Sequence, residues 1–220
     1  MANPKHILIV EGESDKSFFD EFCREYNLDS NVTIAPPKSL EAGTHNSKQG
    51  VINILPTYLR QLADGQLEKL GVVVDADNIE HGSGFSATLS VFSEIVSEFG
   101  FVAPEAVAGE GMLFKHNDGL ADFGLWIMPN NAGDGMLEHW ISQCIAGEEQ
   151  ELYRLATTTV GGLPSPKFRP VHKIKAEIAT WLAWQEKPGA GLYYAVRSSL
   201  FNERAPLHSA LLKWLEHVYQ

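Results

Sequence analysis

Residues 6–15 read HILIVEGESD, an apolar run that ends in Glu11 and Gly12 and continues into further acids. An uninterrupted apolar run of this length predicts a strand buried on both faces, as in a parallel sheet. From Asp15 onward, aromatic residues recur at helical spacing, and the glycine is expected to let the chain turn sharply into that helix. Glu11 is therefore predicted at the carboxyl end of a central strand.

A second buried strand is predicted at residues 70–77, which read LGVVVDAD and end in Asp75 and Asp77. Between the two lie a short predicted strand (32–35), a polar loop (38–49) and a helix (51–62) that Pro56 is expected to kink or destabilise. Strands that alternate with helices in this way predict right-handed βαβ units and a parallel sheet with ligands outside the carboxyl ends of its strands. The predicted fold class is α/β, a Rossmann-like core with helices on both faces.

The rest of the chain divides at about residue 150. Before it, we predict a helix at 87–99, one or two strands within 111–129 and a helix at 133–145. After it the strand pattern stops, and three helical stretches (173–185, 191–198 and 207–219) follow a Gly/Pro-containing segment, 157–170, that is expected to be flexible. We therefore expect an α/β metal-binding domain at 1–150 and a helical C-terminal extension at 151–220, packed on it.

Composition limits the classes of protein that the chain can represent. Of its 220 residues 44% are hydrophobic and 20% charged, and no apolar run is long enough to span a membrane. The first residues lack a secretory cleavage site, and Cys23 and Cys144 lie among apolar residues on predicted helices, which favours buried, reduced thiols and a cytoplasmic location. A net charge of −11 argues against a broad basic surface, so any contact with nucleic acid must be local.

Asp75 and Asp77 form an Asp-x-Asp pair, and strand alternation is expected to point both side chains the same way. Paired carboxylates suit Mg²⁺ or Mn²⁺, hard cations that prefer oxygen ligands. Taken alone, such a pair also occurs in dehalogenase-type phosphatases and in sugar-nucleotide transferases. For Glu13 and Asp15, the alternative to a metal role is that they cap the helix that follows.

One predicted strand ends in Glu-Gly, and a later predicted strand, after one further βα unit, ends in Asp-x-Asp. This pattern resembles the Toprim domain of topoisomerases, primases, OLD-family nucleases and ribonucleases that mature ribosomal RNA. The resemblance covers residues 5–100 and matches Glu11, Asp75 and Asp77 to that family's metal-binding acids, and Asp15 to the acid of its nuclease-type members. Residues 126–141, WIMPNNAGDGMLEHWI, resemble small stand-alone Toprim-like proteins of unknown function, which makes Glu138 a further candidate.

The resemblance implies phosphoryl transfer on nucleic acid with Mg²⁺ or Mn²⁺, most simply by a nuclease, with metal at Glu11, Asp15, Asp75, Asp77 and Glu138. No ATPase region, primase zinc segment or topoisomerase body accompanies these residues, so cleavage through a tyrosine is not expected. Two alternatives remain open: a non-catalytic Toprim-like module that binds metal or phosphate and acts through protein partners, for example in phage defence, and a small phosphatase.

Basic residues collect in one stretch of this acidic chain. Residues 152–176 contain no Asp or Glu but contain Arg154, Lys167, Arg169, Lys173 and Lys175. One interpretation is a solvated flexible face, and the other is a phosphate clamp that faces the metal site. In the second interpretation Lys173 and Lys175 act with Glu11, Asp75 and Asp77 in catalysis by stabilising charge on the transferred phosphoryl group.

Overall fold

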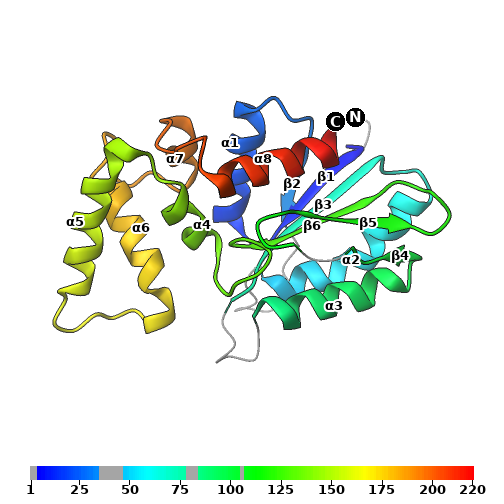
Figure 1. Ribbon diagram of the computed structural model, residues 1–220, viewed down its shortest axis with the longest axis horizontal. Coiled ribbons are helices and arrows are strands. Elements are labelled where there is room, and N and C mark those ends of the chain that lie inside the picture. Colours follow the sequence, from blue (N-terminus) through cyan, green and yellow to red (C-terminus); the bar gives the residue numbers. More distant parts are fainter. Residues whose placement is uncertain (1–3, 35–46, 78–83, 105–106) are drawn as a thin grey trace.

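A computed structural model describes residues 4–34, 47–77, 84–104 and 107–220 of the chain, and it contains one six-stranded sheet (Figure 1). The strand order is β2-β1-β3-β6-β5-β4. The strands are β1 (His6–Val10), β2 (Asn31–Ile34), β3 (Lys69–Asp75), β4 (Phe101–Val102), β5 (Met112–His116) and β6 (Phe123–Met128). The predicted α/β class is confirmed, because β2, β1, β3 and β6 pair in parallel and carry helices between them.

The two strands predicted from their apolar runs are the centre of this sheet. β1 and β3 pair directly and run in the same direction, from His6 opposite Lys69 to Ile9 opposite Val72. On its other side β3 pairs with β6, so that Asp75 lies opposite Met128. The carboxyl ends of β1, β3 and β6 therefore meet at one edge of the sheet.

Helices cover both faces of the sheet, as predicted (Figure 1). One face packs against α2 (Lys48–Ala63), which continues through Pro56, and α3 (Phe85–Ser97). The other face packs against α1 (Glu13–Glu25), α4 (Leu137–Cys144) and α8 (Pro206–Tyr219). Because successive residues of a strand point to opposite faces, the continuous apolar runs of β1 and β3 supply both cores.

The segment predicted as a helical extension, residues 151–220, contains two different parts. α5 (Gln150–Gly161) and α6 (Lys173–Ala183) form a hairpin at one end of the molecule, and α7 (Tyr193–Arg197) packs beside α1 (Figure 1). α8 instead covers the sheet: the Tyr219 hydroxyl donates to the Ile7 carbonyl at 2.7 Å. Trp214 lies against Gly111 and Gly124, where a Cβ atom would stand 2.0 and 3.2 Å from its side chain.

Several local predictions differ from the structure. The sheet is not wholly parallel: β5 is antiparallel to β6 because residues 117–122 are too few for a crossover, and β4 is antiparallel to β5. Residues 157–161, predicted to be flexible, belong to α5, where Ala156 and Val160 recur at helical spacing and are buried. The loop predicted at 38–49 lies largely outside the described residues, but Lys48 opens α2, because Ser47 caps this helix.

Both cysteines are buried free thiols, as predicted. Burial raises the pKa of the Cys23 thiol to about 11 and that of Cys144 to about 12. Thiols held in the neutral form are poor nucleophiles, so neither cysteine belongs to a reactive site.

Candidate functional site

Glu11 and Asp75 meet at the carboxyl edge of the sheet. Glu11 directly follows β1 and Asp75 ends β3, and the Asp75 amide donates to Glu11 Oε1 at 2.8 Å. The prediction that these two acids lie together at the ends of adjacent parallel strands is confirmed.

The amino end of α4 brings a third acid to this edge. The amide of Leu137, the first residue of α4, donates to Asp75 Oδ1 at 3.0 Å. The first amides of a helix have no partner within the helix, so a carboxylate at that place satisfies one and favours the helix dipole. Glu138 is the next residue, and only 10% of its side chain is exposed. A hydrogen-bonded series thus links β1, β3 and α4 and delivers Glu138 to the cluster.

The loop before α4 is fixed to the chain just beyond β3. Asp77 and Gly135 exchange two backbone hydrogen bonds of 2.8 Å. Gly135 has φ of +140°, a conformation that other residues rarely adopt, and a Cβ atom there would stand 2.9 Å from His139 Nδ1. Glycine is therefore required at this position for the loop to set the start of α4.

Asp15 belongs to the cluster and also caps α1. Its Oδ2 accepts from the Gly12 amide at 3.1 Å, so the capping role considered from the sequence is present. The chain bends at Glu11 and Gly12 directly before α1, as predicted, but the bend does not require glycine. Gly12 has an extended backbone, φ −147° and ψ 177°, and a Cβ atom there would make only ordinary contacts.

Burial and mutual repulsion disfavour the charged forms of these acids. Burial, with added repulsion from Asp77 and Asp15, raises the pKa of Glu11 to about 7 although the Asp75 amide and Lys48 oppose the shift. Burial and Glu138 raise the pKa of Asp15 to about 6. Burial and the charges of Glu11, Asp15 and Glu138 raise the pKa of Asp75 well above its usual value. A cation at the cluster would relieve the repulsion.

The two predicted lysines lie in different surroundings. Lys175 Nζ stands 3.4 Å from Glu138 Oε1, and the charges of Glu138, Asp75 and Asp15 raise the pKa of Lys175 against the effect of burial. Lys173, nearer the start of α6, pairs instead with Glu177 at 3.6 Å. Of these two lysines, Lys175 is the one that acts directly on the acid cluster.

Asp77 does not continue the strand as the predicted alternation requires. β3 ends at Asp75, and Asp77 has a left-handed backbone with φ of +64°. Its Oδ2 lies 2.7 Å from Lys48 Nζ, which also donates to the Ala76 carbonyl and the Thr88 hydroxyl, each at 3.2 Å. Asp77 still raises the pKa of Glu11, so it stands near the cluster while its carboxylate is paired with a lysine.

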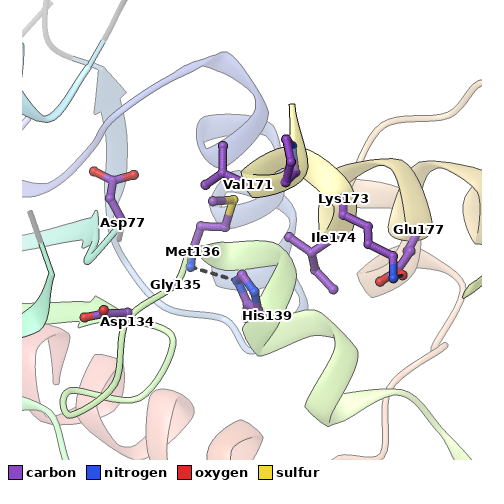
Figure 2. A pocket seen from close by; sticks show the side chains of 10 residues that line it. Asp77, Asp134, Gly135, Met136, His139, Val171, Lys173, Ile174 and Glu177 are labelled. Atoms are coloured by element: carbon purple, nitrogen blue, oxygen red, sulfur yellow. Dashed lines mark hydrogen bonds and ion pairs between the residues drawn. The ribbon is translucent and has the colours of Figure 1, made fainter. Parts of the chain in front are cut away.

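A cavity of about 370 Å³ is lined by Asp77 and by His139, the residue after Glu138 (Figure 2). Figure 2 shows Asp77 and Asp134 on one side of it and the residues of α6 on the other, with Met136 and His139 between them. The amide of Met136 donates to His139 Nδ1 at 3.2 Å, and burial lowers the pKa of this histidine. Sequence reasoning missed both His139 and Lys48.

A comparison with protein-family models matches residues 5–220 to a family described as "Protein of unknown function (DUF3226)". The chain belongs to the DUF3226 family. No curated protein and no solved structure matches the chain. Within the described part of this DUF3226 protein, no helix has the length and apolar character to cross a membrane.

The donor set of the DUF3226 site suits a hard divalent cation in chemistry, because Glu11, Asp15, Asp75 and Glu138 offer only oxygen atoms. Their positions are less favourable: among the described residues, no group of three or more His, Cys, Asp or Glu side chains is arranged to hold a metal ion. Binding a metal at the cluster therefore requires these carboxylates to move toward one another.

Proposed function

We propose that this DUF3226 protein is a Mg²⁺- or Mn²⁺-dependent phosphoryl-transfer enzyme, a nuclease that hydrolyses nucleic-acid phosphodiesters. The observation that carries the proposal is the convergence of Glu11, Asp15, Asp75 and Glu138, which come from two strand ends and two helices, beside Lys175. The resemblance of the same acids to those of Toprim nucleases supports it.

In the proposed reaction, Glu11, Asp75 and Glu138 would hold the cation, with Asp15 at their side. When bound, the cation neutralises charge on the phosphate and helps to activate the attacking water. Asp15 can accept the proton of that water, because a carboxylate beside the attacking water can act as a general base. Lys175 can stabilise charge that develops on the phosphoryl oxygens, and we assign Asp77 and Lys48 to positioning the end of β3.

The proposed partner is nucleic acid, bound by a local basic surface. Arg154, Lys167, Arg169 and Lys173 are exposed on the α5–α6 hairpin or its connecting loop, within the acid-free stretch 152–176. In the described part of the chain, none of the first three forms an ion pair with an acid, so their charges are available to phosphates. The buried free thiols suit a reducing cytoplasm, where we place the protein.

The test is an activity screen of the purified protein on single-stranded, duplex and structured RNA and DNA. We expect cleavage with Mg²⁺ or Mn²⁺ that stops with a chelator and returns when metal is restored. The variant Asp75→Asn serves as the blank, since it keeps the shape of the side chain and removes its charge. Equal cleavage by wild type and Asp75→Asn would overturn the proposal.

Replacing Lys173 and Lys175 together with Gln is expected to weaken nucleic-acid binding and reduce its salt dependence. Each phosphate contact that releases a counterion contributes about 0.7 to 0.9 to the slope of log K against log salt, so losing two should lower the slope by about 1.5. Fluorescence anisotropy at several salt concentrations measures the slope. The matched control is Lys187→Gln with Lys213→Gln, the same charge change at two exposed lysines. An unchanged slope would mean that the two lysines are merely solvated.

The second candidate, a non-catalytic module that binds metal or phosphate and works through a protein partner, is favoured by the net charge of −11. It predicts metal binding without turnover on any nucleic acid in the screen. Including a small phosphomonoester among the substrates separates the phosphatase alternative, which predicts turnover of that compound alone.

A further inference from the structure

The cavity beside the acid cluster is formed by neighbours of the proposed catalytic residues. Asp77 lies two residues after Asp75, His139 directly follows Glu138, and Lys173 lies two residues before Lys175. A molecule in this cavity would contact Asp77 and His139, the chain neighbours of Asp75 and Glu138, and not the four acids of the cluster themselves. Its volume of about 370 Å³ is near the lower end of the range of ligand pockets, about 300 to 1,000 Å³.

The lining combines one apolar side with several polar groups (Figure 2). The apolar residues are Met136, Pro170, Val171 and Ile174. Such side chains suit the flat face of a nucleobase, which stacks on apolar and aromatic surfaces. The polar residues are Asp77, Asp134, His139, Lys173 and Glu177. Carboxylates accept from amino groups of bases and from sugar hydroxyls, and a lysine contacts phosphate.

The hydrogen bond of His139 determines what its ring can offer. His139 is the third residue of α4, the place where Glu or Gln commonly accepts from the amide of the capping residue. Nδ1 accepts from the Met136 amide here, so the proton of the neutral ring is on Nε2. His139 can therefore donate one hydrogen bond to an acceptor in the cavity.

We infer that this cavity binds one unpaired nucleotide of the substrate, with the base against Val171 and Ile174 and the phosphate toward Lys173. The inference rests on the proposed nuclease function and narrows it. Under this inference the substrate presents an unpaired nucleotide, as in a single strand, a frayed end or a base displaced from its duplex.

The test measures binding of the four 5′-nucleoside monophosphates to the metal-free protein by calorimetry. Val171→Trp fills the cavity, and Leu163→Trp makes the same kind of change at an exposed residue between α5 and α6. We expect wild type and Leu163→Trp to bind at least one nucleotide with equal affinity. Val171→Trp should bind that nucleotide with an affinity at least about tenfold lower, a loss of about 1.4 kcal/mol or more. Equal binding by Val171→Trp, or no binding by wild type, would overturn the inference.

A second variant keeps the test decisive if Val171→Trp fails to fold. His139→Gln preserves an acceptor for the Met136 amide and removes the ring, so it should fold and bind the nucleotide more weakly. Binding equal to wild type would count against the inference.

Asp75→Asn separates the nuclease proposal from the cavity inference, since this variant should bind the nucleotide normally without cleaving nucleic acid. Cleavage by wild type without nucleotide binding overturns the cavity inference alone, whereas nucleotide binding without any cleavage supports the cavity and overturns the nuclease.

Discussion

Asp75→Asn is expected to abolish metal-dependent cleavage and at the same time to raise the melting temperature of the metal-free protein. A change at a residue that only supports the fold would lower activity and stability together. A loss of activity together with a gain in stability is characteristic of a functional site whose charged groups destabilise the folded protein.

The loss of activity follows from the removal of a metal-binding charge at the centre of the cluster. The Asp75 amide donates a hydrogen bond to Glu11, and the Asp75 carboxylate accepts one from the first amide of α4. An Asn oxygen can still accept from the Leu137 amide, so α4 should keep its position. We expect turnover to fall by about 10²-fold or more, as for the loss of a group that stabilises the transition state.

The gain in stability follows from the same electrostatics. Burial and three neighbouring acids disfavour the charged form of Asp75, which Lys175 offsets only in part. A neutral amide removes that repulsion, and a gain of about 1 kcal/mol raises the melting temperature of a protein of this size by about 2 to 4 °C. The control is Asp118→Asn, the same atomic change at a side chain that is 84% exposed, where calorimetry should find little shift. A lower melting temperature in Asp75→Asn would contradict this account.

The centre of the fold could be predicted because the relevant signals are local. The apolar runs that end at Val10 and Asp75 are long enough to define buried strands, and parallel connection then places Glu11 and Asp75 at one edge. The edge strand β4 has two residues and gives no periodic signal. The helix α5 was missed because a run of threonines and two glycines obscured the spacing of Ala156 and Val160.

The rest of the site could be predicted only in part, because it depends on the residues at which strands end and helices begin. Alternation was extended through Asp77, but the strand ends two residues earlier, and the left-handed backbone of Asp77 allows its pairing with Lys48. Lys48 could have been found from Ser47, which caps α2 ahead of an apolar stripe. His139 offered no comparable signal, because a histidine at the start of a helix gains meaning only when a cavity is known to lie beside it.

The stability of the metal-free protein is expected to respond to pH through Glu11. The pKa of Glu11 is about 7 in the folded protein and 4.5 for an ordinary, solvated glutamate, so the folded state binds more protons between those two pH values. Stability contributed by this group is therefore complete below pH 4.5 and is lost as pH rises through about 7. Asp15, with a pKa of about 6 in the folded protein, acts in the same direction.

Other groups titrate in the same range, so the measurement must compare a variant with wild type. Burial lowers the pKa values of His139 and His208, which makes their contribution to stability rise with pH. Glu11→Gln removes one titration and leaves an oxygen that can accept from the Asp75 amide. The free energy of unfolding of wild type minus that of Glu11→Gln should fall between about pH 5 and pH 8, on the order of a few kcal/mol.

Mg²⁺ provides the decisive comparison, because a cation that binds the ionised cluster should reverse this loss. A ligand that binds only the folded state stabilises it by RT ln(1 + [L]/Kd), about 2.7 kcal/mol at a hundred times Kd. Since the acids must be deprotonated to bind metal, the gain should be larger at pH 8 than at pH 5 in wild type and strongly reduced in Glu11→Gln. Denaturant titrations with Mg²⁺ and with a chelator at each pH measure both effects. A gain from Mg²⁺ that is equal in the two proteins would place the bound cation elsewhere and remove Glu11 from the proposed metal site.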